Sequence, residues 1–112
     1  MKLTQSRKND FVILAVEGRV DNNTTPLLEE KVQNILDAEQ GGLLMDFSDL
    51  DYINSSGLRI LVMAFQKLNQ SGGKLRLCGL KDYILEVFQI SGYDKIFQLY
   101  PTREEALQEA GA

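Results

Sequence analysis

The sequence predicts a single α/β domain, residues 1–112, in which a mixed, mostly parallel sheet of four to five strands packs against about four helices. The first observation is that apolar, strand-like runs alternate with segments of helical periodicity after residue 20. The second is the segment 43–65, which passes from a short apolar strand through a polar loop into an apolar helix. In α/β proteins such a loop lies at the carboxyl end of the sheet, where ligands and partners bind. Function is therefore expected near residues 54–57.

The first third of the chain predicts two strands followed by a helix. Residues 1–9 alternate weakly in polarity, which is typical of an edge strand, and a turn at residues 9–10 leads into the apolar run 11–17. This continuous run predicts a strand that is covered on both faces. A polar loop then ends in a helix-start signal, with Thr25 as N-cap and Pro26 in the first helical position. The helix should bury one stripe, which consists of Leu28, Val32, Ile35 and Leu36.

The middle segment predicts a strand, a loop and a helix in that order. Residues 43–47 form the strand, residues 48–54 form the loop, and the helix begins near Ser55. A strip outside its core-facing side carries Ile60 and Met63 beside Ser56. Two interpretations of this strip stay open, because a neighbouring loop could cover it or it could be an exposed docking surface. The face expected against the sheet carries Leu58, Leu61, Val62, Phe65 and Leu68.

The last third predicts two more pairs of strand and helix. Residues 74–78 alternate as a strand, and residues 81–91 form a helix that ends at Gly92. Residues 96–100 predict a short final strand, after which Thr102 caps a terminal helix. The faces expected in the core are Ile84, Val87 and Phe88 for the first helix, and Ala106, Leu107 and Ala110 for the second.

Charge and composition exclude several functions. The 12 Lys and Arg residues are scattered and are outnumbered by 16 Asp and Glu, so no basic patch could neutralise a run of phosphates and no nucleic acid partner is expected. The apolar runs are far shorter than the about 20 residues of a transmembrane helix, so we expect no membrane insertion and a cytoplasmic protein. The chain has no histidine, which removes Ser-His-Asp catalysis and the usual zinc ligands. Cys78 is expected to be a small buried residue, and no metal or other cofactor is predicted.

Three motifs resemble the STAS domain, in particular the stand-alone bacterial anti-sigma factor antagonists. The segment Gly18-Arg19-Val20-Asp21 is similar to the family's G-x-h-D after the second strand, where h is an apolar residue. The segment LLMDFSDLDYINSSGLRILV resembles the family signature of an apolar strand, D-h-S and D-S-S-G-L. Residues 91–97, with 105–107 beyond them, are similar to the closing region. Three ordered motifs at the expected separations are more specific than any one alone.

The resemblance implies a partner-switching function. In that family the unmodified protein binds an anti-sigma factor that is also an ATP-dependent serine kinase, and so frees a sigma factor. The kinase phosphorylates the serine after the acidic residue of the signature, and binding is lost. That serine corresponds to Ser55, with Ser56 as the second choice, and a metal-dependent serine phosphatase reverses the modification. The family's loop aspartate corresponds to Asp21.

Without the resemblance, Asn54-Ser55-Ser56 would be interpreted as a helix cap and nothing more. With the resemblance, these residues are interpreted as a phosphorylation switch, and two physical arguments agree with this interpretation. A phosphate at a helix N-terminus meets free N–H groups and the positive end of the dipole, so the fold should tolerate the modification. If a partner protein covered this phosphate, its unpaired charge would lie in the interface and would oppose binding. The expected partner-facing patch consists of Asp21, Asn22, Asn54, Ser55, Ser56, Gly57, Ile60 and Met63.

Asn54 departs from the family pattern, which has an acidic residue at this position. Asparagine keeps the size, the capping ability and an acceptor oxygen, but it loses the charge. The departure favours an alternative function, a STAS scaffold or ligand-binding subunit of a transporter or stress-signalling complex that is not phosphorylated. A third class, an enzyme with Ser55 as nucleophile and Asp46, Asp49 or Asp51 as acid or base, is disfavoured because no histidine or lysine lies near in sequence to activate the serine.

Overall fold

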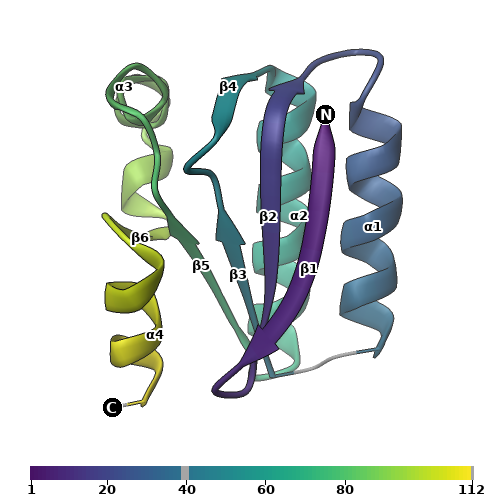
Figure 1. Ribbon diagram of the computed structural model, residues 1–112. Helices are drawn as coiled ribbons and strands as arrows, with labels where there is room; N and C mark the ends of the chain where they lie inside the picture. Colours follow the sequence, from purple (N-terminus) through teal and green to yellow (C-terminus); the bar gives the residue numbers. More distant parts are fainter. Residues whose placement is uncertain (39–40, 112) are drawn as a thin grey trace.

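The chain forms a three-layer α/β structure (Figure 1). The computed structural model describes residues 1–38 and 41–111, with side chains described as far as residue 108. The predicted α/β class, the mixed and mostly parallel sheet and four helices are confirmed for these residues. The strands are β1 (Lys2–Lys8), β2 (Phe11–Val20), β3 (Gly42–Asp46), β4 (Leu50–Ile53), β5 (Lys74–Cys78) and β6 (Gln98–Tyr100). The helices are α1 (Thr25–Ala38), α2 (Ser55–Gln70), α3 (Asp82–Ser91) and α4 (Arg103–Gly111), with a short 3₁₀ turn, η1 (Tyr93–Lys95), before β6.

The sheet has the order β1-β2-β3-β5-β6, in which β1 is antiparallel to β2 and the other pairs are parallel. The sixth strand, β4, pairs with the carboxyl-terminal part of β2, beyond the part that pairs with β3. The sequence prediction missed β4, because residues 48–54 are rich in turn formers. It also ended the strand that is now β2 at residue 17, three residues too early. Since β2 continues to Val20, its last residues provide an edge on which a short strand can pair.

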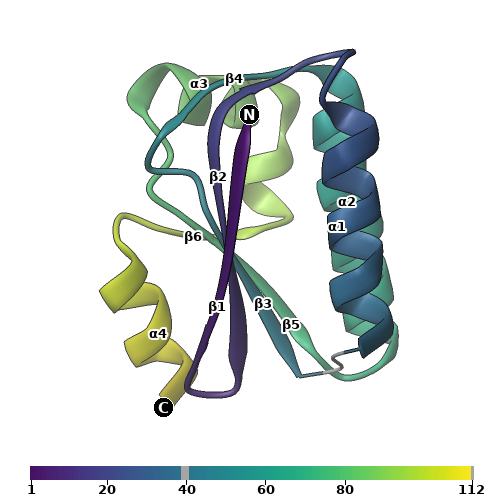
Figure 2. The same cartoon turned by 45° about the vertical axis from the view of Figure 1, so that its right-hand side comes forward.

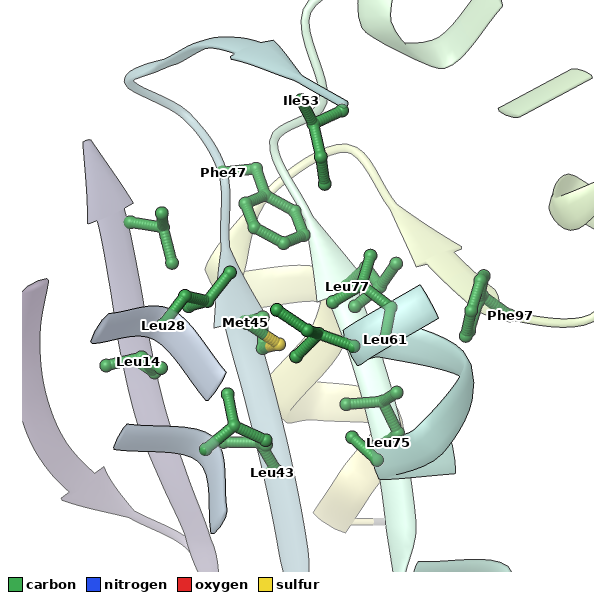
Figure 3. Packing of buried hydrophobic residues seen from close by; sticks show 14 of the residues in the cluster. Leu14, Leu28, Leu43, Met45, Phe47, Ile53, Leu61, Leu75, Leu77 and Phe97 are labelled. Atoms are coloured by element: carbon green, nitrogen blue, oxygen red, sulfur yellow. The ribbon is translucent and has the colours of Figure 1, made fainter. Parts of the chain in front are cut away.

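Helices α1 and α2 cover one face of the sheet, and α4 covers the other (Figure 2). Successive strand side chains point to opposite faces, so the apolar run of β2 feeds both layers, as predicted. On the larger face, Leu14, Met45 and Leu77 of three neighbouring strands contribute to one core with Leu28 of α1 and Leu61 of α2 (Figure 3). All five are fully buried, and these contacts fix α2 across the sheet.

The smaller face is closed by α4 over Phe11, Leu44 and Cys78. Arg76 also lies here and is only 3% exposed. Its guanidinium stacks near the Phe11 ring and donates to the carbonyl of Ala106 across 2.8 Å, which fastens α4 to β5. Ala106 and Leu107 are buried as predicted, whereas Ala110 lies outside the residues whose side chains are described.

Two predictions for the last third need correction. In α3 the residues Ile84 and Phe88 are buried, but Val87 is 38% exposed, because only the side of the helix that carries Ile84 and Phe88 packs against the core. The final strand is shorter than predicted, since the N–H groups of Ile96 and Phe97 donate to the Tyr93 carbonyl of the preceding 3₁₀ turn. Gly92 ends α3 in a left-handed conformation, with φ 79°, as its position predicted. No helix in the described part of the chain is long and apolar enough to cross a membrane.

Candidate partner-binding site

Two loops that are distant in sequence meet at the carboxyl ends of β2 and β4. These strands are parallel neighbours, with Val20 paired to Ile53, so the β2–α1 loop and the residue before α2 leave the sheet together (Figure 1). Nδ2 of Asn54 donates a hydrogen bond of 3.0 Å to Oδ1 of Asn22. The fold therefore brings the two halves of the predicted patch into direct contact.

Asn54 is the N-cap of α2. Its backbone is extended, and its Oδ1 accepts a 2.8 Å hydrogen bond from the N–H of Gly57. Its own N–H donates to the carbonyl of Val20 at 3.0 Å, which fixes the start of the helix to the end of β2. Both ends of the side chain are thus engaged, because the oxygen caps α2 and the amide holds Asn22. A carboxylate could provide the cap but could not donate to Asn22.

Asp21 builds the entry to α1. Its Oδ1 accepts hydrogen bonds from the N–H groups of Asn23, at 3.0 Å, and Thr24, at 3.2 Å. Its own N–H donates to Oγ1 of Thr24 across 2.9 Å, and Arg19 lies 3.8 Å from the other carboxylate oxygen. These bonds form an Asx turn that sets the shape of the loop. The helix begins at Thr25 itself, one residue before the predicted start, because the Thr24 carbonyl accepts the first helical bond.

The two serines differ in their surroundings. Ser55 is the first residue of α2 and is exposed, and no described residue forms a hydrogen bond with its hydroxyl. Ser56 is half-buried and lines a groove between α1 and α2. The Ser55 side chain is therefore more accessible from outside the protein than that of Ser56.

Gly57 lies beneath the patch rather than on its surface. It is buried, and a Cβ added there would lie 2.7 Å from Cγ1 of both Val20 and Ile53. Only a glycine allows the first turn of α2 to lie this close to the ends of β2 and β4. The residue acts through packing, which keeps the N-terminus of α2 at the sheet edge.

Of the two interpretations left open for the strip that carries Ile60, the covered one holds for this residue. Ile60 is only 6% exposed and Met63 is half-buried, because α1 packs alongside α2 and covers this strip. The sequence interpretation had considered a loop as the covering element, whereas the cover is a whole helix. Nε2 of Gln33 in α1 lies 3.5 Å from the Met63 sulfur, and Oε1 of Gln33 accepts a 2.7 Å hydrogen bond from Lys67 of α2.

Between the two helices a groove of about 440 Å³ remains open beside Ser56. Ile60 and Met63 contribute its apolar part, while Glu29 of α1 and Arg59 of α2 contribute opposite charges. The sequence interpretation did not include Glu29 and Arg59 in the site, because nothing in a helical pattern distinguishes them from ordinary charged surface residues. The complete lining consists of Thr25, Pro26, Glu29, Ser56, Arg59, Ile60 and Met63.

Two of the three aspartates considered as acids or bases, Asp46 and Asp51, have other partners. Asp46 accepts hydrogen bonds from Ser48 and from Arg103 of α4, on the face of the sheet opposite α2. Burial acts to raise the pKa of Asp46, but the bonds from Ser48 and Arg103 outweigh it and hold the pKa below its ordinary value. Asp51 forms a 2.6 Å bond with Lys81, which raises the pKa of that lysine. Among the described residues no group of three metal-ligating side chains is present.

The site is a capped helix N-terminus with an exposed serine, set in the polar surface that the two loops form. The family model of the STAS domain matches residues 2–106, and the chain belongs to the STAS domain family.

Within this family the chain is similar to proteins named anti-sigma factor antagonists. It is 36% identical to BtrV of Bordetella bronchiseptica, which is assigned to that group by name, over 95% of this chain and 91% of BtrV. It is 30% identical to the anti-sigma-B factor antagonist of Bacillus subtilis, over 93% of this chain and 94% of that protein. The crystal structure of an anti-sigma factor antagonist from Mycobacterium paratuberculosis superposes with a TM-score of 0.89 at 26% identity, covering 99% of this chain and 94% of that one.

Proposed function

We propose that this protein is an anti-sigma factor antagonist of a bacterial partner-switching pathway. The unphosphorylated form binds an anti-sigma factor that is also a serine kinase, and the sigma factor is released. Phosphorylation of Ser55 abolishes that binding, and a metal-dependent serine phosphatase restores it. The protein itself turns over no substrate, and its function is exerted in the cytoplasm. One observation carries the proposal, namely that Ser55 is exposed beside the Asn54–Asn22 contact in a chain related to anti-sigma factor antagonists.

The transfer of a phosphoryl group to Ser55 requires no other residue of this chain as a reactant. The Ser55 hydroxyl oxygen attacks the γ-phosphorus of ATP bound to the kinase, the bond between that phosphorus and the β-γ bridging oxygen breaks, and ADP leaves. The hydroxyl proton passes to a base of the kinase or to solvent. The product carries about two negative charges at neutral pH. Because α2 presents free N–H groups and no acidic residue in its first turn, the phosphate should leave the fold intact.

The partner would contact the surface that the two loops form. Asn22 and Ser55 are exposed, and Asp21, Asn54 and Ser56 are half-buried between them. Gly57 and Ile60 support this surface from below, and Met63 continues it along the groove. An anti-sigma factor that covers Ser55 would have to bury a phosphate where it otherwise meets a hydroxyl, and removing that charge from water costs several kcal/mol. The switch would therefore act on binding and leave stability largely unchanged.

The proposal is tested with purified components. The protein is incubated with ATP and its cognate anti-sigma factor, and mass spectrometry identifies the modified residue. Ser55→Ala should abolish the modification, whereas Ser91→Ala, at an exposed serine in the last turn of α3, serves as the matched control. In a binding assay Ser55→Asp should weaken the complex and Ser55→Ala should not. Modification of another serine with Ser55 untouched would reject the assignment.

Asn54 supports one alternative, a STAS scaffold or ligand-binding subunit that is never phosphorylated. Its amide is occupied by Asn22, so the residue has a structural reason to be asparagine that is independent of any kinase. This alternative predicts a stable complex that ATP does not dissociate. Neighbouring genes distinguish the two functions, since a kinase-like ATPase and a phosphatase favour switching, whereas a permease favours the alternative.

A further inference from the structure

Arg59 is an exposed cation at the edge of the proposed site. It lies in the second turn of α2 and lines the groove together with Ser56, Ile60 and Met63. No described residue forms an ion pair or hydrogen bond with its guanidinium. Glu29 lies on the α1 wall of the same groove, but the two charges do not form an ion pair. The guanidinium is therefore available to a group from outside the chain.

The spacing along α2 also places Arg59 within reach of the two serines. It follows Ser55 by four residues and Ser56 by three, and side chains at these spacings lie on one helix face with Cβ atoms about 6 Å apart. An arginine side chain is long enough to bridge that distance to a phosphate. Arginine and phosphate form the stronger, charge-assisted class of hydrogen bond, which can be bidentate.

Resting on the function proposed above, we propose that Arg59 is the contact that phosphorylation removes. In the unmodified protein its guanidinium binds a carboxylate of the anti-sigma factor at the mouth of the groove. Once Ser55 carries a phosphate, the phosphate pairs with Arg59 within the same helix. The anti-sigma factor can then no longer bind Arg59, and it also faces the negative charge of the phosphate.

Charge supports a carboxylate as the partner group. Of the seven residues that line the groove, Arg59 is the single cationic one, and it is free of internal partners among the described residues. Arginine is also among the residues that most often dominate an interface when a partner group covers them. A carboxylate and a phosphate compete for the same planar donor set, so one residue can serve both states of the switch.

The first experiment measures the pairing without any partner protein. Phosphoserine is incorporated at position 55 during translation, and its second ionisation is followed by ³¹P NMR in the wild-type background, in Arg59→Gln and in Lys74→Gln. Lys74 is an exposed lysine at the amino end of β5, the opposite end of the sheet, and controls for the loss of one charge. The ionisation constant should be about two- to threefold larger with Arg59 than with glutamine. Equal constants in all three proteins would overturn the proposal.

The second experiment measures the docking contact. Arg59→Gln should weaken binding of the unmodified protein to the anti-sigma factor by about fivefold or more, while Lys74→Gln should bind like the wild type. Phosphorylation should then reduce the affinity of Arg59→Gln by a smaller factor than it reduces that of the wild type. An unchanged affinity in Arg59→Gln would overturn the docking role. If the ³¹P shift is present but phosphorylation leaves binding intact, the switch at Ser55 fails while the pairing stands.

Discussion

The side chain of Asn54 connects two elements, since its oxygen caps α2 and its amide donates to Asn22 in the β2–α1 loop. The two residues are 32 positions apart in sequence. Their contact explains how asparagine replaces the acidic residue expected from the family signature without loss of the helix cap. It also gives the patch a defined shape before any partner arrives.

Replacement of Asn54 separates its two roles. Asn54→Ala removes both bonds and should lower the free energy of unfolding by about 1–2 kcal/mol, since an N-cap is lost. Asn54→Asp keeps the cap and adds a favourable charge at the helix N-terminus, but it loses the bond to Asn22. It should therefore remain within about 1 kcal/mol of the wild type. Urea denaturation measures both, and an alanine variant as stable as the wild type would contradict the capping role.

A side chain at position 57 should disturb the first turn of α2. In Gly57→Ala the new Cβ would lie 2.7 Å from atoms of Val20 and Ile53, so the helix has to move away from the sheet edge. Overpacking of this kind costs about 1–3 kcal/mol, and the better helix propensity of alanine recovers part of it. Thermal denaturation is the measurement. Ser56→Ala, at the neighbouring and less buried position, is the control and should change stability by less than about 0.5 kcal/mol.

Asp46 should make stability depend on pH in the acid range. Its pKa in the folded protein is lowered by Ser48 and Arg103 despite burial, so its stabilising contribution is present above the unfolded pKa of about 3.9 and is lost as pH falls through the folded value. Asp46→Asn should be less stable than the wild type at pH 7, and the difference should narrow below about pH 4. Urea denaturation at pH 7 and pH 3 compares the two proteins. A constant difference between them would show that the charge of Asp46 contributes nothing.

Cys78 should be inert in the folded protein. Burial, followed by the negative charge of Asp46, raises the pKa of its thiol to about 12, so almost no thiolate exists at pH 8. A disulfide reagent should therefore label Cys78 only after unfolding in urea. Since the chain has a single cysteine, one equivalent of released thiol reports the reaction directly. Rapid labelling without denaturant would contradict the assignment of Cys78 to the sheet core.

Local patterns predicted most of the fold correctly. Alternation in residues 74–78, the stripe through Leu28 and Val32 and the stop at Gly92 are local signals, and the structure confirms each of them. The strand β4 could not be predicted this way, because its stability comes from pairing with the extended end of β2 rather than from its own composition. The four residues of β4, Leu-Asp-Tyr-Ile, are also too few to show a strand pattern between turn-forming neighbours.

The same reasoning explains which parts of the site the sequence prediction missed. A helix cap within residues 54–56 follows from local chemistry and was predicted, and the structure assigns it to Asn54. The burial of Ile60 depends on α1 lying beside α2, and no local pattern gives the distance between two helices. The Asn22 contact needs the register of β2 and β4. Arg59 could have been found from its spacing of four residues after Ser55. Periodicity alone, however, does not distinguish such a residue from any other charged residue on the solvent-exposed side of a helix.

The most direct measurement compares the unmodified protein with the protein carrying phosphoserine at position 55. Dissociation constants for the anti-sigma factor and thermal unfolding curves are recorded for both. The affinity should fall by about a hundredfold or more, because the interface would have to accommodate an added phosphate and lose the Arg59 contact, while the unfolding temperature stays within a few degrees. Equal affinities, or a phosphorylated protein that no longer folds, would contradict a switch that acts on the surface alone.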